Sequence, residues 1–313
     1  MITIMNNIIF PPGLNIVKNN INIEILKEFA EGWDIEYLKM EKGDLNLSFE
    51  VTHTPRVQLA YENYEKGVLI KGQYPQNAVV LAVVHSEGKA NFKQNILETN
   101  ELIIAHSDEV LDFLSFKKSY IYTITIEENL FYSTFYNHFS KDGIYMLKNK
   151  QLFIKPNQLE AFEHNILKWI NFFKNTTIEN KKYILHEKEI LNDIFSALII
   201  KNKSKERLKF DISKVRKDLD KYLQDAIDIP ILSKKHSISE RQLHNTFKRI
   251  YGYTPKQYLN SLRLNAIRKI FLSKTKDTIF TIASQYQYFH MGHFSKEYKK
   301  MFNETPTETR KTT

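Results

Sequence analysis

Two stretches near the C-terminus place cationic, imidazole and amide side chains along one stripe of a helix. Residues three, four and seven positions apart share a helical face. This spacing relates the members of two sets: Arg241, His244, Asn245 and Lys248, and then His293, Lys296, Lys299 and Lys300. Guanidinium, imidazole and amide groups can hydrogen-bond to base edges, whereas ammonium groups neutralise phosphates. The two stripes therefore predict contact with a nucleic acid.

The composition and the motifs argue against several other chemistries. The chain of 313 residues contains no cysteine, which excludes thiol nucleophiles, disulfides and thiolate metal sites. Residues 1–200 contain no His-x-His pair, and the chain has no G-x-S-x-G, phosphate-binding loop or G-x-G-x-x-G motif. We therefore expect no catalytic residue, no metal site and no cofactor. The longest apolar run, residues 78–84, is too short to span a bilayer, and a cytoplasmic protein is expected.

The charge is distributed unevenly along the chain. The formal net charge is +9. Residues 201–313 carry 25 Lys and Arg against 11 Asp and Glu, a net charge of +14, while residues 1–200 carry 20 against 25, a net charge of −5. A basic region attached to an acidic body suits a polyanionic partner. A solvated surface would carry the same charges, so charge alone leaves both interpretations open.

The basic region contains an internal repeat. Segments 243–255 and 294–306 match at a constant offset of 51 residues, pairing Leu243 with Phe294, Phe247 with Tyr298, Tyr251 with Phe302 and Pro255 with Pro306. Gly252 and Asn303 fall at the same place in each copy, and both residue types suit a left-handed helix terminus. Polar residues that can cap helices precede each predicted helix: Asp228, Ser239, Thr254, Thr278 and Thr305.

Each copy is therefore predicted as a helix–turn–helix unit. The first unit covers about 229–252 and the second about 279–303, with Ile231 and Ile282 taken as equivalents, and a long helix at 255–273 joins them. The units form a predicted domain at 211–313, preceded by a linker at 201–210. Two such helices on a rigid connector can enter successive major grooves of DNA. The side chains expected to contact phosphates are Ser239, Lys248, Arg249, Lys256, His290, Lys299 and Lys300.

The first 200 residues read differently. Short runs of β-branched and aromatic residues separated by turn signals predict strands at about 44–126, and helical periodicity predicts helices at about 127–200. The fold class is thus α+β, a small β-barrel or sandwich with helices, followed by an all-α domain. The apolar stripe from Leu159 to Phe173 suits either a dimer interface or a helix packed on the barrel. The aromatic residues that could line an effector pocket are Tyr61, Tyr64, Tyr74, Phe113 and Tyr122, although packing is the commoner role for such residues.

At these residues the chain resembles the AraC/XylS family of bacterial transcription regulators. The matched stretch is about 229–310, and it includes the motif Ser239-x-x-x-Leu243-x-x-x-Phe247-Lys248-x-x-x-Gly252-x-x-Pro255 and the later Phe302-x-x-x-Pro306. The Phe289–Gly292 stretch and the ending around Glu308 are most similar to the branch that contains the ethanolamine-utilisation operon regulator. Two residues depart from the family pattern: Gln287 replaces a glycine and must take a positive φ or remodel its turn, and Thr309 replaces a tyrosine.

The resemblance implies roles for residues in both units. The base-contacting residues would be Arg241, His244, Asn245, Met291, Gly292, His293 and Lys296. It also implies a cupin-like regulatory and dimerisation domain at 1–200, with double-stranded DNA as partner. RNA polymerase, a small-molecule effector and a homodimer through residues 127–200 are candidate partners.

Three functional hypotheses follow. The first is a sequence-specific transcription regulator, an activator, controlled by a signal sensed in the N-terminal domain. The second is a constitutive DNA binder whose N-terminal domain only dimerises or binds a protein. The third is a cupin-type enzyme fused to a DNA-binding domain.

Overall fold

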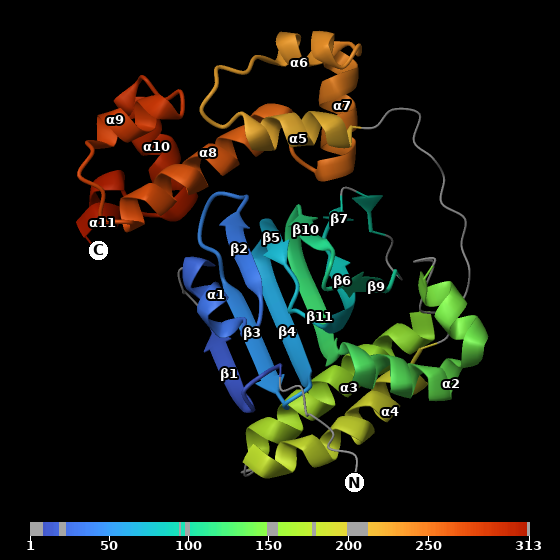
Figure 1. The fold of residues 1–313 in the computed structure, drawn as a ribbon. Coiled ribbons are helices and arrows are strands. Elements are labelled where there is room, and N and C mark those ends of the chain that lie inside the picture. Colours follow the sequence, from blue (N-terminus) through green and yellow to red (C-terminus); the bar gives the residue numbers. More distant parts are fainter. Residues whose placement is uncertain are drawn as a thin grey trace.

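The computed structural model describes residues 9–18, 23–93, 95–97, 101–148, 156–176, 180–198 and 212–311. Two antiparallel sheets and a group of helices form the N-terminal part, and a helical domain is stacked on one side of it (Figure 1). The predicted α+β class is therefore confirmed. The predicted linker at 201–210 lies outside the described residues.

The strands form two sheets that face each other. Their bounds are β1 Gly13–Lys18, β2 Asp34–Lys39, β3 Leu47–His53, β4 Val57–Lys66, β5 Val68–Gln73, β6 Ala78–Ser86, β7 Ala90–Phe92, β8 Asn95–Ile96, β9 Ile103–His106, β10 Val110–Ser115 and β11 Lys117–Glu127. The first sheet has the order β1-β3-β4-β11-β6-β9 and the second β2-β5-β10-β7-β8. Strands β1 and β2 precede the predicted range of 44–126. Both gain their hydrogen bonds from partners distant in sequence, β3 and β5, which local patterning does not reveal.

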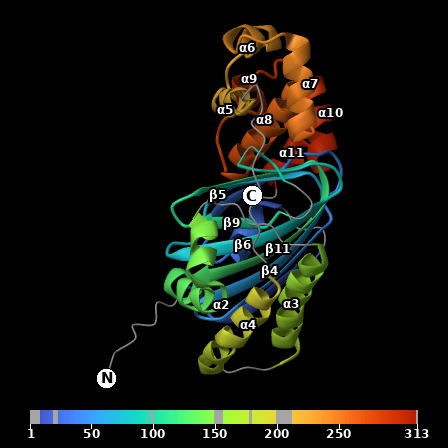
Figure 2. The ribbon, with the colours of Figure 1, turned by 90° about the vertical axis from the view of Figure 1, so that its right-hand side faces the viewer.

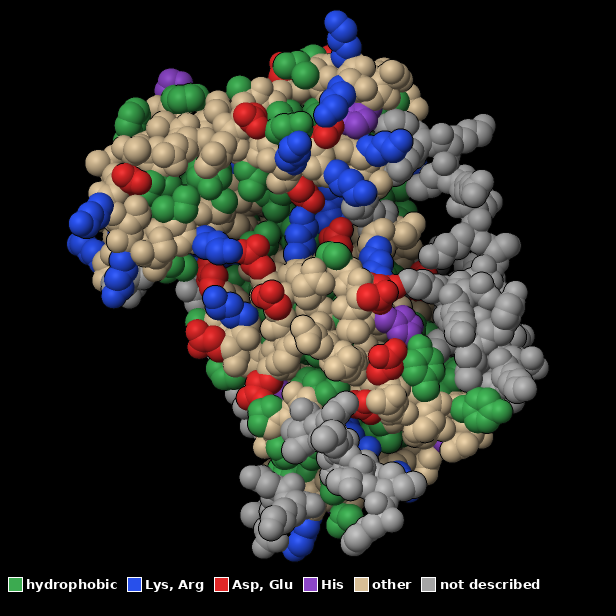
Figure 3. All heavy atoms as spheres, viewed as in Figure 1, with side chains coloured by type: hydrophobic (Ala, Val, Ile, Leu, Met, Phe, Trp, Pro, Cys, Tyr) green, Lys and Arg blue, Asp and Glu red, His purple; other side chains and the backbone are tan. Residues whose placement is uncertain are grey.

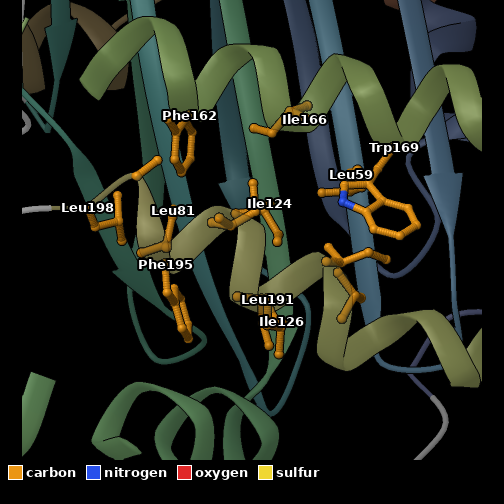
Figure 4. Packing of buried hydrophobic residues seen from close by; sticks show 14 of the residues in the cluster. Leu59, Leu81, Ile124, Ile126, Phe162, Ile166, Trp169, Leu191, Phe195 and Leu198 are labelled. Carbon is orange, nitrogen blue, oxygen red and sulfur yellow. The ribbon is translucent and has the colours of Figure 1, made fainter. Parts of the chain in front are cut away.

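Helices cover the outer face of the first sheet. The bounds of the N-terminal helices are η1 Ile23–Ile25, α1 Leu26–Phe29, α2 Glu128–Lys148, α3 Pro156–Asn175, η2 Asn180–His186 and α4 Glu187–Ser196. The stripe of α3 is buried against Leu59 and Ile124 of the sheet and Leu191 of α4 (Figure 4). Of the two roles considered for this stripe, a dimer interface or packing within the chain, the structure shows packing within the chain. A dimer through residues 127–200 would have to use other surfaces.

The C-terminal domain contains the two predicted helix–turn–helix units. Its helices are α5 Ser213–Lys221, α6 Ile229–Lys235, α7 Glu240–Tyr251, α8 Pro255–Leu272, α9 Ile279–Gln285, α10 Met291–Phe302 and α11 Pro306–Lys311. Helices α6 and α7 form the first unit, α9 and α10 the second, and α8 joins them. Gly252 and Asn303 end α7 and α10 in the left-handed conformation, with φ values of 78° and 60°. The same stop thus recurs in both copies, as predicted.

Most of the predicted caps form. Thr254 and Gln257 bond reciprocally in a capping box, and Thr305 and Glu308 do the same. Ser239 and Thr278 each accept a backbone hydrogen bond at the start of α7 and α9. Asp228 is the exception, because its side chain makes no cap hydrogen bond at α6; proline at the second helical position already removes one of the amides that a cap would satisfy.

The repeat has two offsets rather than one. Helices α7 and α10 are 51 residues apart, but α6 and α9 are 50 residues apart. The pairing of Ile231 with Ile282 was therefore wrong: Ile231 is 62% exposed, whereas Ile282 is 1% exposed and corresponds to the buried Leu232. The second unit consequently carries one extra residue between its two helices.

The C-terminal domain rests on the outer face of the second sheet. Leu69 and Leu114 of that sheet share an apolar cluster with Phe247 and Tyr258. Asn265 of α8 hydrogen-bonds to both backbone groups of Lys39, through a bond from the Lys39 amide and another to its carbonyl. Figure 3 shows basic and acidic side chains interspersed where the two domains meet. Ion pairs that join the domains include Lys269 with Glu36 and Lys71 with Asp220.

Candidate nucleic-acid interface

Helices α7 and α10 are held by equivalent buried stripes. Leu243, Phe247 and Ile250 of α7 are each 0% exposed, as are Phe294 and Tyr298 of α10. Helix α8 is buried along much of its length and fixes the two units relative to each other. Figure 2 shows α7 and α10 on the same side of the domain. Entry of two helices into successive major grooves requires that they lie on the same side of the domain.

The structure exposes almost all of the residues expected to contact DNA. Arg241, His244 and Asn245 are exposed on α7, and Gly292, His293 and Lys296 are exposed on α10. Met291 is half-buried because it packs against the apolar cluster of the second unit. The residues expected to contact phosphates are all exposed: Ser239, Lys248, Arg249, Lys256, His290, Lys299 and Lys300.

Two departures from the family pattern are accommodated locally. Gln287 adopts a φ of 69°, and its side-chain amide donates to the backbone carbonyl of Gln224 at 2.6 Å. The left-handed turn is therefore kept without glycine. Thr309 is buried, and its hydroxyl lies 2.9 Å from the hydroxyl of Tyr298, so that α11 is tied to α10 through a hydrogen bond.

The charges around the two helices are asymmetric. The last turn of each helix is basic, with Lys248 and Arg249 in α7 and Lys299 and Lys300 in α10. The first turn of α7 contains Glu240, whereas that of α10 contains no acidic residue. The carboxylate of Glu297 beside Lys300 is paired with Lys42 of the N-terminal domain at 2.7 Å. Bonding to the Lys42 ammonium group holds the pKa of Glu297 below its ordinary value, so this acid stays ionised and neutralised.

Replacing Lys299 by Ala should weaken binding to all DNA sequences alike. An exposed lysine that contacts a phosphate releases about one counterion, so the slope of log affinity against log salt should become smaller by about 0.9. Titrations at several salt concentrations would measure this slope. Lys188→Ala, an exposed lysine on α4, is the control and should keep the wild-type slope. An unaltered slope in Lys299→Ala would show that this lysine does not contact DNA.

A cavity of about 70 Å³ lies between the two sheets of the N-terminal domain. Of the predicted effector-binding residues, Tyr74 and Phe113 line it, whereas Tyr64 does not but donates a hydrogen bond to the lining residue Glu62. Tyr61 and Tyr122 do not line it. They lie on the other face of the first sheet, against the helices, because neighbouring residues in a strand face opposite sides.

Sequence reasoning missed the polar groups of this cavity. Gln58 and Glu62 line it from β4, and the indole of Trp33 donates to the side-chain oxygen of Gln58 at 2.6 Å. The hydroxyl of Tyr74 is buried and has no hydrogen-bond partner in the part of the chain that the structure describes. The signal was present in β4, where Gln58 and Glu62 alternate with Val57, Leu59 and Tyr61 and therefore share one face of the strand.

Sequence comparisons with known proteins find a known domain in the C-terminal part of the chain. A family described as a helix-turn-helix domain matches residues 232–312. The chain is 30% identical over 93 residues to a XylDLEGF operon transcriptional activator of Pseudomonas putida, covering 29% of each chain. It is 37% identical over 79 residues to the HTH-type transcriptional activator RhaS of Pectobacterium carotovorum subsp. carotovorum (strain PC1), covering 25% of this chain and 28% of the relative.

Among solved structures, a probable AraC family transcriptional regulator from Rhodopseudomonas palustris CGA009 is 26% identical, with a TM-score of 0.31. The match covers 32% of this chain and 94% of that one. The chain spans less than a third of the length of the two curated relatives. In the described residues, no helix is both long and apolar enough to cross a membrane. Residues 232–312 therefore match a helix-turn-helix domain, and this part of the chain is similar to transcriptional activators.

Proposed function

We propose that this protein is a sequence-specific DNA-binding transcription regulator, and an activator, that places α7 and α10 in successive major grooves. The observation that carries the proposal is the pair of recognition helices fixed on one side of the domain by α8, with their hydrogen-bonding side chains exposed. The names of the curated relatives support activation. The ethanolamine branch, a cytoplasmic location and contact with RNA polymerase stay predictions.

Replacing Arg241 by Ala tests the proposal at one base pair. Arginine pairs with guanine through two hydrogen bonds, and such a contact discriminates against the wrong base by about 1–3 kcal/mol. We expect Arg241→Ala to lose preference at one position of the selected site and to bind more weakly by that amount. Selection from randomised DNA, followed by sequencing, measures the preference. If the selected site of Arg241→Ala equals that of Lys188→Ala at every position, Arg241 does not read a base.

We also propose that the N-terminal domain controls DNA binding through the second sheet. Successive residues of β10 point to opposite faces of the second sheet. Leu111 and Phe113 line the cavity on one face. On the other face, Asp112 bonds to Arg216 of α5 and Leu114 packs against the C-terminal domain. In β5, Ile70 lines the cavity and Lys71 pairs with Asp220 of α5. A small-molecule effector in the cavity would therefore press on the same strands that hold the DNA-binding domain. A thermal-shift screen against metabolites tests this, and no shift by any compound would favour a constitutive binder.

A further inference from the structure

The one-residue difference between the two units places an aromatic side chain at the start of α10. In the turn of each unit, a backbone amide bonds back to the preceding helix, from Ile238 to Ser233 and from Tyr288 to Ala283. These pairs are 50 residues apart. The first amide bonds of the recognition helices, from Leu243 to Ser239 and from Phe294 to His290, are 51 residues apart. The extra residue between these anchors is Phe289.

Phe289 does not take part in the core of its unit. Tyr288, which precedes it, is 9% exposed and belongs to the apolar cluster, whereas Phe289 is 60% exposed. In the first unit the same turn leads from the half-buried Ile238 directly to the helix cap Ser239. Phe289 therefore has no packing role that the first unit shares.

The surroundings of Phe289 suit an apolar contact in the major groove. Phe289 directly precedes His290, the N-cap residue of α10, and Gly292 lies within the first turn of this helix. A side chain on Gly292 would meet nothing within 4 Å, so the first turn of α10 is open at this position. The first turn contains no acidic group that would repel DNA. The first unit, by contrast, presents Arg241, His244 and Asn245, which read bases by hydrogen bonds.

Building on the proposed DNA-binding function, we propose that Phe289 is a specificity-determining residue that contacts the C5-methyl group of a thymine in the major groove. Thymine is the base that presents a methyl group in that groove, and apolar side chains, phenylalanine included, recognise it there. The second unit would then add an apolar contact to the hydrogen bonds that His293 and Lys296 can make.

Uracil substitution tests the contact, because uracil differs from thymine in lacking this methyl group alone. Full-length protein and a duplex obtained by selection from randomised DNA are titrated, with each thymine replaced by uracil in turn. For the wild type we expect about fourfold weaker binding at one thymine in the half-site of the second unit, the effect of one methyl-sized group worth about 0.8 kcal/mol. Phe289→Ala should bind the thymine and uracil duplexes equally at that position.

Matched variants keep the test specific. Phe280→Ala removes another exposed phenylalanine of the same unit, 56% exposed on α9, and should keep the wild-type sensitivity to uracil. Phe289→Leu retains an apolar group and should keep part of it. The proposal is overturned if no thymine is sensitive in the wild type, or if Phe289→Ala loses as much affinity as the wild type at each uracil. If selection yields no preferred sequence at all, the proposed function itself fails.

Discussion

Replacing Arg216 by Met should lower the free energy of unfolding by about 3–5 kcal/mol, the range found when one partner of a buried ion pair is removed. Arg216 is 0% exposed between the two domains. It donates to Asp112 of β10 and, through Nε, to the hydroxyl of Tyr258 at 2.8 Å. That hydroxyl donates in turn to Asp220. Methionine would fill much of the volume but would leave the carboxylate of Asp112 without its cation.

The magnitude follows from burial rather than from charge alone. The ion pair of Lys269 and Glu36 also joins the two domains, but its side chains are 74% and 45% exposed, and such pairs contribute about 0–1 kcal/mol. Arg216 is thus expected to contribute far more to stability than this exposed pair. Its loss should weaken both the C-terminal domain, which contains it, and the attachment of that domain to the second sheet.

Urea unfolding followed by two probes would measure this effect. Far-UV ellipticity reports on all the helices, whereas fluorescence reports on the N-terminal domain, since both tryptophans, Trp33 and Trp169, lie there. We expect the ellipticity transition of Arg216→Met to move to lower urea. Arg249→Met, an exposed arginine of α7, should change stability by less than about 0.5 kcal/mol. Equal transitions for the two variants would contradict a structural role for Arg216.

Replacing Glu62 by Gln should make the N-terminal domain more stable relative to the wild type at pH 8 than at pH 5. Enclosure among the apolar side chains of the cavity raises the pKa of Glu62 to about 7, against the opposing hydrogen bond from Tyr64. The folded state therefore holds this proton more tightly than the unfolded state. The resulting contribution to stability is fully present below pH 4.5, the ordinary pKa of a glutamate in the unfolded chain. It is lost as the pH rises through the folded-state pKa of about 7. Glutamine has no proton to lose.

We expect the stability difference between Glu62→Gln and the wild type to grow by about 2–3 kcal/mol between pH 5 and pH 8, from a shift of this size. Tryptophan fluorescence in urea at the two pH values would measure it. Burial lowers the pKa of His53 to about 4, which costs stability as the pH falls below its ordinary value of 6.5, but this affects both proteins equally. Glu160→Gln, on the exposed side of α3, is the control, and its stability difference from the wild type should not change with pH. The prediction is refuted if the stability difference of Glu62→Gln changes with pH as little as that of the control.

The local signals in the sequence predicted the C-terminal domain closely. Gly252 and Asn303 end α7 and α10 in the left-handed conformation, and Thr254 with Gln257 forms the expected capping box. These features involve residues within a few positions of one another, so the sequence pattern is enough to specify them. The exceptions are Asp228, whose side chain makes no cap hydrogen bond, and the pairing of Ile231 with Ile282, which assumed one offset throughout the repeat.

The N-terminal domain was predicted in class but not in arrangement. Which face of β4 lines the cavity is decided by the second sheet, whose strands β2, β5 and β10 line the cavity opposite it. The sequence alone therefore could not separate Tyr74 and Phe113, which line the cavity, from Tyr61 and Tyr122, which do not.

By itself, the sequence determined that the chain carries two helix–turn–helix units with exposed, DNA-compatible stripes, because helical periodicity, caps and stops are local. The tertiary structure alone decided three other things: that the stripe of α3 is buried within the chain, that Glu62 lies in a cavity, and that Arg216 joins the domains through Asp112. Each of these depends on residues brought together by folding over long sequence separations, and such contacts leave no periodic pattern in the sequence.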